Sequence, residues 1–281
     1  MPLPRGRPRA RASGSGVRSG SVSAKSAGKA IGKCNLARRE AILILRLAVA
    51  WAFSVIIMTD TDIPSIAQRR ADILQRIEEA AEAAPSRTSA HLVAVSKQQP
   101  EERIEAMLET GQHIFGENRV QEAQTRWRNR RQDWPDLQLR LIGPLQSNKA
   151  VDAVALFDVI ETLDRPKLVD ALAKAITKTG RTPDILIQVN TGEEPQKAGV
   201  RAKDLPDLLS RAKSAGLNVT GLMCIPPAAE PAGPHFAFLA KLAGQHDLKT
   251  LSMGMSSDYE TAIKFGATHV RVGSALFGAR P

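Results

Sequence analysis

Eight short apolar runs, separated by stretches long enough for a helix, constrain the fold of this chain more than any other feature of its sequence. The starts of successive runs are 18 to 35 residues apart, enough for one strand, one helix and two loops. Four of the intervening stretches have helix signals, and a glycine follows each of the four, as a left-handed helix stop requires. The runs are 91–97, 113–118, 139–143, 157–162, 184–190, 219–225, 250–254 and 269–273, and the glycines are Gly111, Gly180, Gly216 and Gly266.

Alternating strands and helices predict an α/β protein with a parallel sheet, because a crossover helix returns the chain to the same end of the sheet. Eight units predict closure into a single (β/α)8 TIM barrel that fills nearly all of 88–281. An open doubly wound sheet has the same periodicity, but no GxGxxG turn follows the first run, which disfavours a dinucleotide-binding fold. An extra N-terminal helix is expected over 63–84, because its apolar residues recur near a period of 3.6 and Pro85-Ser86 ends it.

The first 57 residues differ from the rest of the chain in charge and composition. They are rich in Arg, Ser, Gly and Ala up to about residue 40, a composition that cannot build a core. Of the 39 basic and 29 acidic residues in the chain, 11 and 1 lie in 1–57, which leaves 28 of each in 58–281. The net charge of +10 therefore belongs to this extension, and no nucleic-acid binding is expected of the barrel.

Residues 41–58 are apolar apart from Arg46 and Ser54, and three interpretations of them compete. The first is a targeting signal or membrane anchor, although the segment is short for a span and Arg46 in a bilayer would cost roughly 3 kcal/mol. The second is a non-spanning extension. The third, which we favour, is translated sequence upstream of a natural start at Met58. We therefore expect an extension over 1–57, a barrel over 58–281 and no membrane role.

The two cysteines, Cys34 and Cys224, fall in segments of very different character. This placement predicts neither a disulfide framework nor a thiolate metal site. A reducing compartment, the cytoplasm, is the expected location, with N-terminal targeting through 41–58 as the alternative.

Polar residues at the carboxyl ends of the strands are the candidates for function, because the active face of a parallel barrel lies there. Lys97 closes the first apolar run, so its stem should be buried and its amine should emerge at the barrel mouth. Burial disfavours an ammonium ion, which makes the amine a better nucleophile. The alternative is a strand-end lysine that extends into solvent. Glu117 and Glu161 also end runs and are expected at the mouth, without partners that the sequence identifies.

Short residues follow the last two runs where helices should begin, namely Ser256, Ser257, Gly273 and Ser274. Free N–H groups and small hydroxyl side chains at such turns form the phosphate site that recurs after barrel strands 7 and 8. Simple helix capping by serine is the alternative. A carbonyl-reactive lysine opposite a phosphate cup predicts pyridoxal 5′-phosphate as the cofactor.

Several other residues are expected to be structural. His91, His113 and His269 lie at strand starts, the end of the barrel away from the mouth. Trp127 and Trp134 are expected to be packing residues, with a stacking platform for a ligand as the alternative.

Seven stretches near the predicted strand ends carry a resemblance to a known family. They are LVAVSK (92–97), FGENRVQEA (115–123), IGPLQSNK (142–149), the spaced set Asn190, Glu194, Lys197 and Gly199, GLMCIP (221–226), LSMGMSSDYETAI (251–263) and VRVGSALFG (270–278). In this order they resemble the YggS/PROSC family of pyridoxal-phosphate-binding homeostasis proteins, single barrels similar to the N-terminal domain of alanine racemase. The resemblance spans the chain from about residue 60 to 281.

The resemblance implies roles for individual residues. Lys97 is implied to carry the cofactor as an internal aldimine, a Schiff base. The other cofactor-binding residues are implied to be Asn118 near the ring, Ser256, Gly273 and Ser274 at the phosphate, Met255 beside them and Arg271 facing the pyridine nitrogen. No metal site is implied.

The sequence departs from the family pattern at three positions. Arg140 stands where many members have His, and Gln99 stands where some have a second Lys. Cys224 replaces a small residue. These departures concern local details and leave the lysine in place.

Arg271 indicates which chemistry the site favours. A guanidinium keeps its proton and disfavours a second positive charge, so the ring nitrogen should stay neutral and strong carbanion chemistry is disfavoured. Racemases with such an arginine add a tyrosine from a separate β-domain, whereas the only tyrosine of this chain is Tyr259. We therefore expect a carrier in pyridoxal phosphate (vitamin B6) homeostasis without strong catalysis, with pyridoxal-phosphate-dependent apo-enzymes as candidate recipients. A racemase-like enzyme with Lys97 as its sole base is the alternative, and a membrane-anchored scaffold is the third hypothesis.

Overall fold

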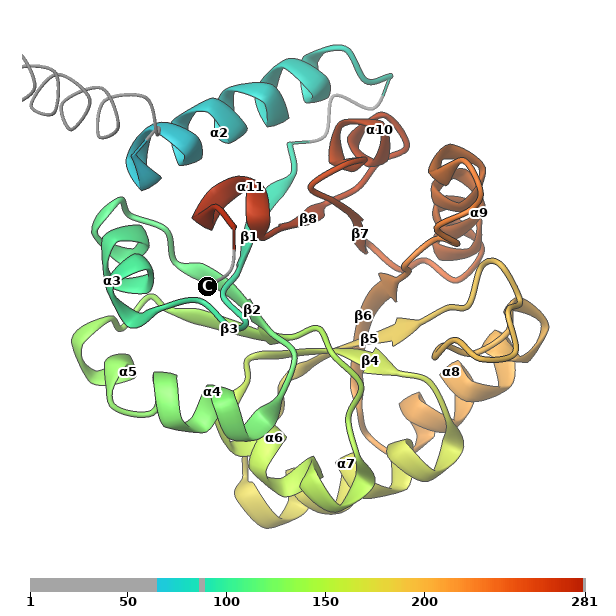
Figure 1. Ribbon diagram of the computed structural model, residues 1–281. Helices are drawn as coiled ribbons and strands as arrows, with labels where there is room; N and C mark the ends of the chain where they lie inside the picture. Colours follow the sequence, from blue (N-terminus) through green and yellow to red (C-terminus); the bar gives the residue numbers. More distant parts are fainter. Residues whose placement is uncertain (1–64, 86–88, 280–281) are drawn as a thin grey trace, which may run out of the picture. The chain divides into compact units, whose positions relative to one another are not determined.

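A computed structural model describes residues 65–85 and 89–279, which form an eight-stranded parallel barrel surrounded by helices (Figure 1). The strands pair in sequence order, and β8 also pairs with β1, so the sheet is closed. This confirms the predicted (β/α)8 TIM barrel. The strands are β1 (His91–Val95), β2 (Ile114–Glu117), β3 (Gln138–Leu141), β4 (Val159–Leu163), β5 (Asp184–Gln188), β6 (Asn218–Met223), β7 (Thr250–Met255) and β8 (His269–Val272).

Helices precede β1 and follow each strand. They are α2 (Ile66–Glu82), α3 (Glu101–Glu109), α4 (Val120–Trp127), α5 (Arg130–Asp133), α6 (Ala150–Leu156), α7 (Pro166–Thr179), α8 (Leu205–Ser214), α9 (Ala232–Gln245), α10 (Tyr259–Lys264) and α11 (Ser274–Phe277), with short 3-10 helices at Ser147–Lys149 and Ala202–Asp204. The extra N-terminal helix is thus confirmed as α2, which begins where Ser65 Oγ accepts a hydrogen bond from the backbone N–H of Gln68 (3.1 Å). The four predicted glycine stops all have positive φ.

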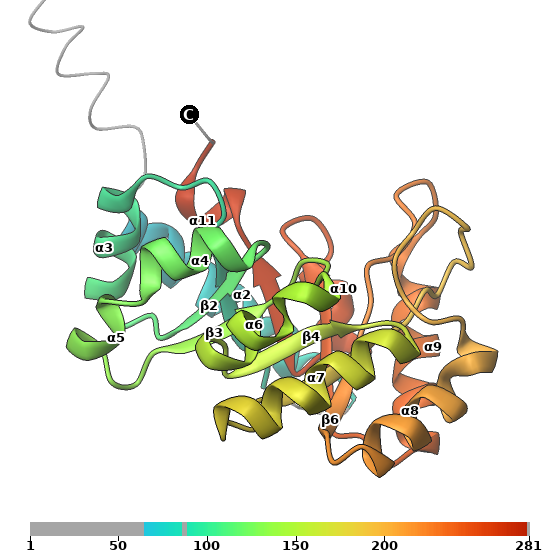
Figure 2. The same cartoon turned by 90° about the horizontal axis from the view of Figure 1, so that it is seen from below.

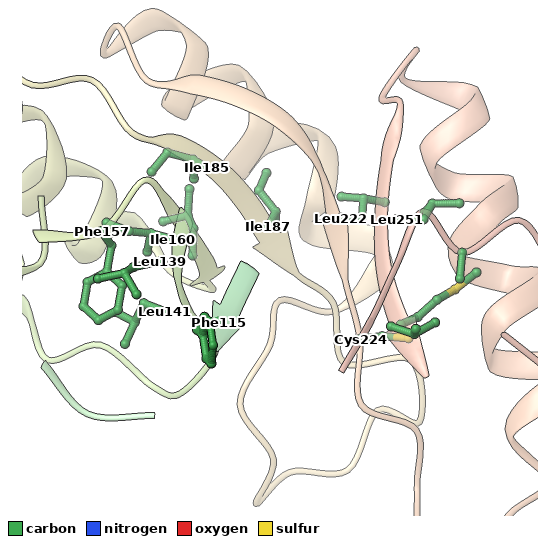
Figure 3. Packing of buried hydrophobic residues seen from close by; sticks show 14 of the residues in the cluster. Phe115, Leu139, Leu141, Phe157, Ile160, Ile185, Ile187, Leu222, Cys224 and Leu251 are labelled. Atoms are coloured by element: carbon green, nitrogen blue, oxygen red, sulfur yellow. The ribbon is translucent and has the colours of Figure 1, made fainter. Parts of the chain in front are cut away.

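Alternate side chains of the strands pack against the helices and form most of the core. Figure 3 shows this layer, and the labelled residues on one strand are two positions apart, as a pleated strand requires. The labelled strand residues are Phe115, Leu139, Leu141, Ile160, Ile185, Ile187, Leu222 and Leu251, all buried. The intervening residues point into the barrel, where Val159, Leu186 and Met223 form a small apolar cluster of their own.

The chain's first described helix lies beside its last two. Helix α2 contacts α10 and α11, and it buries Ile73 and Ile77 (Figure 1). Figure 2 shows α11 and the loops that follow β5 and β6 at the same end of the barrel, the upper end in that view. The carboxyl ends of the strands therefore share one mouth.

The predicted extension over 1–57, with its apolar segment 41–58, lies outside the described residues. Within the part of the chain that the structure describes, no helix is both long and apolar enough to cross a membrane. The same residues contain no group of three or more His, Cys, Asp or Glu side chains placed to hold a metal ion.

Candidate functional site

One pocket at the barrel mouth brings together all seven residues predicted for the site. It has a volume of about 170 Å³. The predicted residues that line it are Lys97, Asn118, Met255, Ser256, Arg271, Gly273 and Ser274, and its other walls are Val95, Ile142 and Ile225. The three apolar walls were not predicted, although Val95 lies two residues before Lys97 and therefore on the same side of the strand.

Strand alternation explains why Lys97 reaches the pocket and its neighbour Ser96 does not. The backbone N–H of Ser96 still pairs with the carbonyl oxygen of Gly116 (3.1 Å), so the extended chain continues past β1. Ser96 is fully buried, and its hydroxyl donates to Glu117 Oε1 (2.7 Å) in the layer between barrel and helices. The next side chain, Lys97, therefore points to the barrel axis and is only half-buried. Immediately afterwards Gln98 has a φ of 56°, and the strand ends.

The expectation that Glu117 faces the mouth is wrong. Its Oε1 accepts hydrogen bonds from Arg126 Nη1 (2.8 Å) and Trp127 Nε1 (3.0 Å), both on α4, and the carboxylate is fully buried. The side chains of Glu117 and Asn118 point to opposite sides of the strand, because the two residues are consecutive. Only Asn118 lines the pocket. Glu117 therefore ties α4 to the barrel, and Trp127 is a core residue as predicted.

Asn118 is held by a close approach of two backbones. A Cβ added to Gly143, which follows β3, would lie 2.3 Å from the carbonyl oxygen of Asn118, so only glycine fits there. The Oδ1 atom of Asn118 is buried and has no hydrogen-bond partner among the described residues. An acceptor of this kind next to a pocket is available to a ligand's donor.

The turns after β7 and β8 meet on the opposite side of the pocket. The backbone N–H of Gly273 lies 3.5 Å from Ser256 Oγ, and Ser274 begins α11. The turn after β7 is fixed by Asp258, whose Oδ1 accepts from the backbone N–H of Met255 (2.6 Å). Two hydroxyl groups and backbone N–H groups are thus collected on this wall, and all are donors suited to an anion.

Arg271 lies at the floor of the pocket and is 4% exposed. Its Nη1 donates to Ser252 Oγ (2.7 Å) and its Nη2 to the carbonyl oxygen of Cys224 (2.8 Å). Burial raises the pKa of the Cys224 thiol to about 12, so that thiol is neutral. The Cys224 side chain belongs to the outer apolar layer (Figure 3), so this departure from the family pattern does not alter the pocket.

The other predicted mouth residue, Glu161, lies inside the barrel and has partners. Its Oε1 accepts from Arg140 Nε (2.6 Å), and its Oε2 accepts from Ser252 Oγ (2.6 Å). The sequence missed these pairs because the partners are on separate strands. A register in which Arg140 pairs with Val159 places Arg140 and Glu161 close together, and no sequence spacing reveals that register.

The described lining of the pocket contains no tyrosine, histidine, aspartate or glutamate. Tyr259 is buried in α10, and the Arg76 guanidinium of α2 lies 5.5 Å from its ring centroid. The rings of His91 and His269, at the strand starts, are 5.2 Å apart. Burial, with the positive Arg140 as the next cause, lowers the pKa of His269 to about 2.

A larger cleft adjoins the pocket and shares Asn118 with it. It has a volume of about 650 Å³ and includes the cationic side chains of Arg119, Lys149 and Arg165. Lys149 is the last residue of the IGPLQSNK stretch (142–149), whereas no sequence pattern indicates this cleft.

Comparisons with known proteins agree on one family. Residues 69–281 match the family model described as alanine racemase, N-terminal domain. The pyridoxal phosphate homeostasis protein of Pasteurella multocida (strain Pm70) is 37% identical over 228 residues, 77% of this chain and 98% of that protein. The protein of the same name from Pseudomonas aeruginosa is 40% identical over 226 residues, 77% of this chain and 96% of that protein.

Solved structures extend the comparison. PipY of Synechococcus elongatus PCC7942, solved with PLP bound, is 38% identical with a TM-score of 0.66, covering 76% of this chain and all of that one. An alanine racemase from Clostridium difficile 630 is 12% identical with a TM-score of 0.61, covering 79% of this chain and 60% of that one, and at that identity it shows a shared fold alone.

Proposed function

The chain belongs to the pyridoxal phosphate homeostasis protein family, and from this premise we propose that it carries pyridoxal 5′-phosphate on Lys97 and serves in vitamin B6 homeostasis. The observation that carries the proposal is the meeting of Lys97, from the first strand, with Ser256, Gly273 and Ser274, from the last two turns, at one pocket. In the attachment step the amine nitrogen of Lys97 adds to the aldehyde carbon, and one water leaves.

The residues present fit this cofactor. A volume of about 170 Å³ is close to that of cavities of ~150 Å³ that hold one benzene ring, and the apolar walls Val95 and Ile142 suit the faces of a ring. The buried Oδ1 of Asn118 can accept from a ring substituent. The hydroxyl groups of Ser256 and Ser274, with the backbone N–H of Gly273, are suited to the phosphate. Met255, next to Ser256 in the chain, also lines the pocket.

Arg271 supports a carrier over a strong catalyst. A bound pyridoxal phosphate supplies an electrophilic carbon and an electron-accepting ring, and the ring accepts electrons best when its nitrogen is protonated. The Arg271 guanidinium can only donate to that nitrogen and disfavours its protonation. Since the described lining also lacks a second acid or base, the residues of this pocket favour retention of the cofactor over proton transfer at a substrate carbon.

Replacement of the lysine tests the proposal directly. The Lys97→Ala variant is expected to lose covalent attachment, because no other amine lines the described pocket. The measurement is the visible absorbance of the purified protein after incubation with pyridoxal phosphate, followed by borohydride reduction and peptide mass spectrometry to locate the modified residue. Lys149→Ala, in the adjoining cleft, is the matched control and should keep both the absorbance and the modification.

Two results would contradict the proposal. One is a Lys97→Ala protein that retains the visible band with the modification at another residue. The other is sustained interconversion of L- and D-amino acids by the wild-type protein, monitored by optical activity, which would favour a racemase-like enzyme.

We also place the protein in the cytoplasm and regard pyridoxal-phosphate-dependent apo-enzymes as its recipients. The free, buried thiol of Cys224 supports the first point. Fractionation of native cells tests it, and recovery in the membrane fraction would instead favour an anchoring role for 41–58. Transfer of cofactor to an apo-enzyme, measured by recovered enzyme activity, tests the second.

A further inference from the structure

The barrel interior holds three side chains of charged residue types at and beneath the pocket, where barrels of this kind are usually filled by branched apolar residues. Arg140, Glu161 and Arg271 are 2%, 0% and 4% exposed. Removing charges from water costs several kcal/mol for each ion unless partners compensate. The proposed function uses Arg271 alone and gives no reason for the other two.

Hydrogen bonds join these groups into one chain that crosses the barrel interior, from the adjacent strands β3 and β4 to the adjacent strands β7 and β8. Arg140 Nε of β3 donates to Glu161 Oε1 of β4 (2.6 Å), and Ser252 Oγ of β7 donates to Glu161 Oε2 (2.6 Å). Arg271 Nη1 of β8 then donates to the same Ser252 oxygen (2.7 Å). The Ser252 hydroxyl has a single proton, which it uses in the hydrogen bond to the Glu161 carboxylate. The lone pairs of the hydroxyl oxygen are therefore left to accept from Arg271.

The charges near Arg271 leave Glu161 as the compensating group. Glu161 Oε2 lies 4.0 Å from Arg271 Nη1. His269, on the same strand, is influenced by the charges of both guanidinium groups, and its pKa of about 2 keeps it neutral. The Cys224 thiol, with its pKa raised to about 12, is neutral as well. The further groups acting on these two are His91 beside His269 and Asp258 near Cys224.

We propose that Glu161 is a positioning residue for the cofactor: acting through Ser252, it fixes where the Arg271 guanidinium points and offsets part of its charge, while Arg140 holds Glu161 in place. The inference rests on the proposed function, in which Arg271 faces the ring nitrogen. It predicts that the electrostatic character of the pocket is determined by a residue that does not line it.

Glu161→Gln is the decisive substitution because it keeps the shape and removes the charge. An amide has one oxygen and one NH2 group, so it can no longer accept from both Arg140 and Ser252. If the NH2 group of the new glutamine faces Ser252, the Ser252 oxygen accepts from both that NH2 group and Arg271. The Ser252 hydroxyl proton then has no acceptor in place of the lost carboxylate. We expect roughly tenfold weaker uptake of pyridoxal phosphate, the equivalent of one charge-assisted hydrogen bond. The more positive pocket should also move the pH midpoint of the visible band down by roughly 0.5–1 unit.

The experiment compares full-length variants in three measurements: thermal midpoint, cofactor dissociation constant and pH midpoint of the visible band. Ser252→Ala, which loses one hydroxyl, should weaken uptake in the same direction. The double variant should be no weaker than Glu161→Gln alone, because the two residues act in series. Glu117→Gln is the matched control, since Glu117 is an equally buried carboxylate paired with an arginine in the outer layer. It should lose stability but keep both cofactor measurements.

Three outcomes would overturn the inference. The first is an unchanged dissociation constant and pH midpoint in Ser252→Ala, a variant that serves even if Glu161→Gln does not fold. The second is an equal shift in Glu117→Gln, which would mean that any buried carboxylate has this effect. The third is full additivity of Glu161→Gln and Ser252→Ala. In all three cases attachment at Lys97 would stand, whereas a wild-type protein that takes up no cofactor would remove the proposed function and this inference together.

Discussion

Single residues at the ends of the strands decide what the pocket contains, because adjacent side chains point in opposite directions. Lys97 reaches the mouth while Ser96 is buried against Glu117, and Asn118 reaches it while Glu117 is buried against α4. Shifting either strand by one residue would exchange a nucleophilic amine for a hydroxyl, or an amide for a carboxylate. Which residue of each consecutive pair points toward the mouth therefore determines the chemical groups of the site.

His269 gives a prediction for stability in acid. Burial first, and then Arg140, His91 and Arg271, lower its pKa to about 2, whereas an unfolded chain has the ordinary value near 6.5. Below that value the unfolded state binds a proton that the folded state excludes, so the free energy of unfolding falls as the pH drops from about 6.5 toward 2. The loss is about 1.4 kcal/mol per pH unit, or roughly 2 kcal/mol between pH 6.5 and pH 5.

His269→Gln should remove this contribution. In urea unfolding at pH 7 and pH 5, the wild-type protein is expected to lose roughly 2 kcal/mol more than the variant between the two conditions. Parallel losses in both proteins would show that His269 is not the source of the acid sensitivity.

At the scale of elements, close contacts between strand ends fix the pocket walls. The approach of Gly143 to Asn118 is one of these contacts, and an added Cβ at Gly143 would meet backbone atoms rather than a flexible side chain. The ends of β2 and β3 must therefore separate if any other residue takes this position.

Gly143→Ala is expected to lower the free energy of unfolding by about 1–3 kcal/mol and to weaken cofactor uptake, because Asn118 must move. Gly244→Ala in α9 is the control, since a Cβ there meets nothing within 4 Å. It should stabilise the helix by about 0.5–1 kcal/mol and leave uptake unchanged. Thermal unfolding and visible titration measure both effects, and equal behaviour of the two variants would contradict the role given to Gly143.

The elements were largely predictable because their signals are local. Apolar runs gave the strands, and glycines such as Gly180 gave the helix ends. Helix α9 was not identified, because Gly233 and Pro234 lie in its first turn and interrupt the helical signal. The partners of Glu117 and Glu161 were also missed, since they depend on how α4 packs and on the register between β3 and β4. The pocket residues were predicted from strand ends and motifs, whereas their buried supports required the tertiary structure.

At the scale of the whole molecule, α2 belongs to the barrel unit. It lies against α10 and α11, which follow the last two strands, and Ile73 and Ile77 are buried there. Truncation of a buried isoleucine of this kind to alanine lowers the free energy of unfolding by about 2–5 kcal/mol. The barrel unit therefore needs the helix before β1 as well as the eight repeating units.

A chain shortened to Met58–Pro281 is expected to keep cofactor uptake and a thermal midpoint within about 2 °C of the full chain, a change below 1 kcal/mol at this size. The reason is that α2 and the whole pocket are retained. A chain that starts at Ser89 and lacks α2 is the comparison and should lose most of its stability. Calorimetry of the three proteins measures this, and a large drop for the Met58 chain would mean that 1–57 contributes to the fold.

The pairing of β8 with β1 has a consequence for the time at which the protein becomes able to bind. Lys97 is made earlier in synthesis than Arg271, Gly273 and Ser274. Strand β8 joins β1, at His91 to Ala94, only after these later residues have been made. While β8 is still inside the ribosome exit tunnel, the nascent chain consequently presents the amine without the guanidinium or the anion-binding turn after β8. We therefore expect capture of the vitamer only after β8 has left the ribosome exit tunnel and paired with β1.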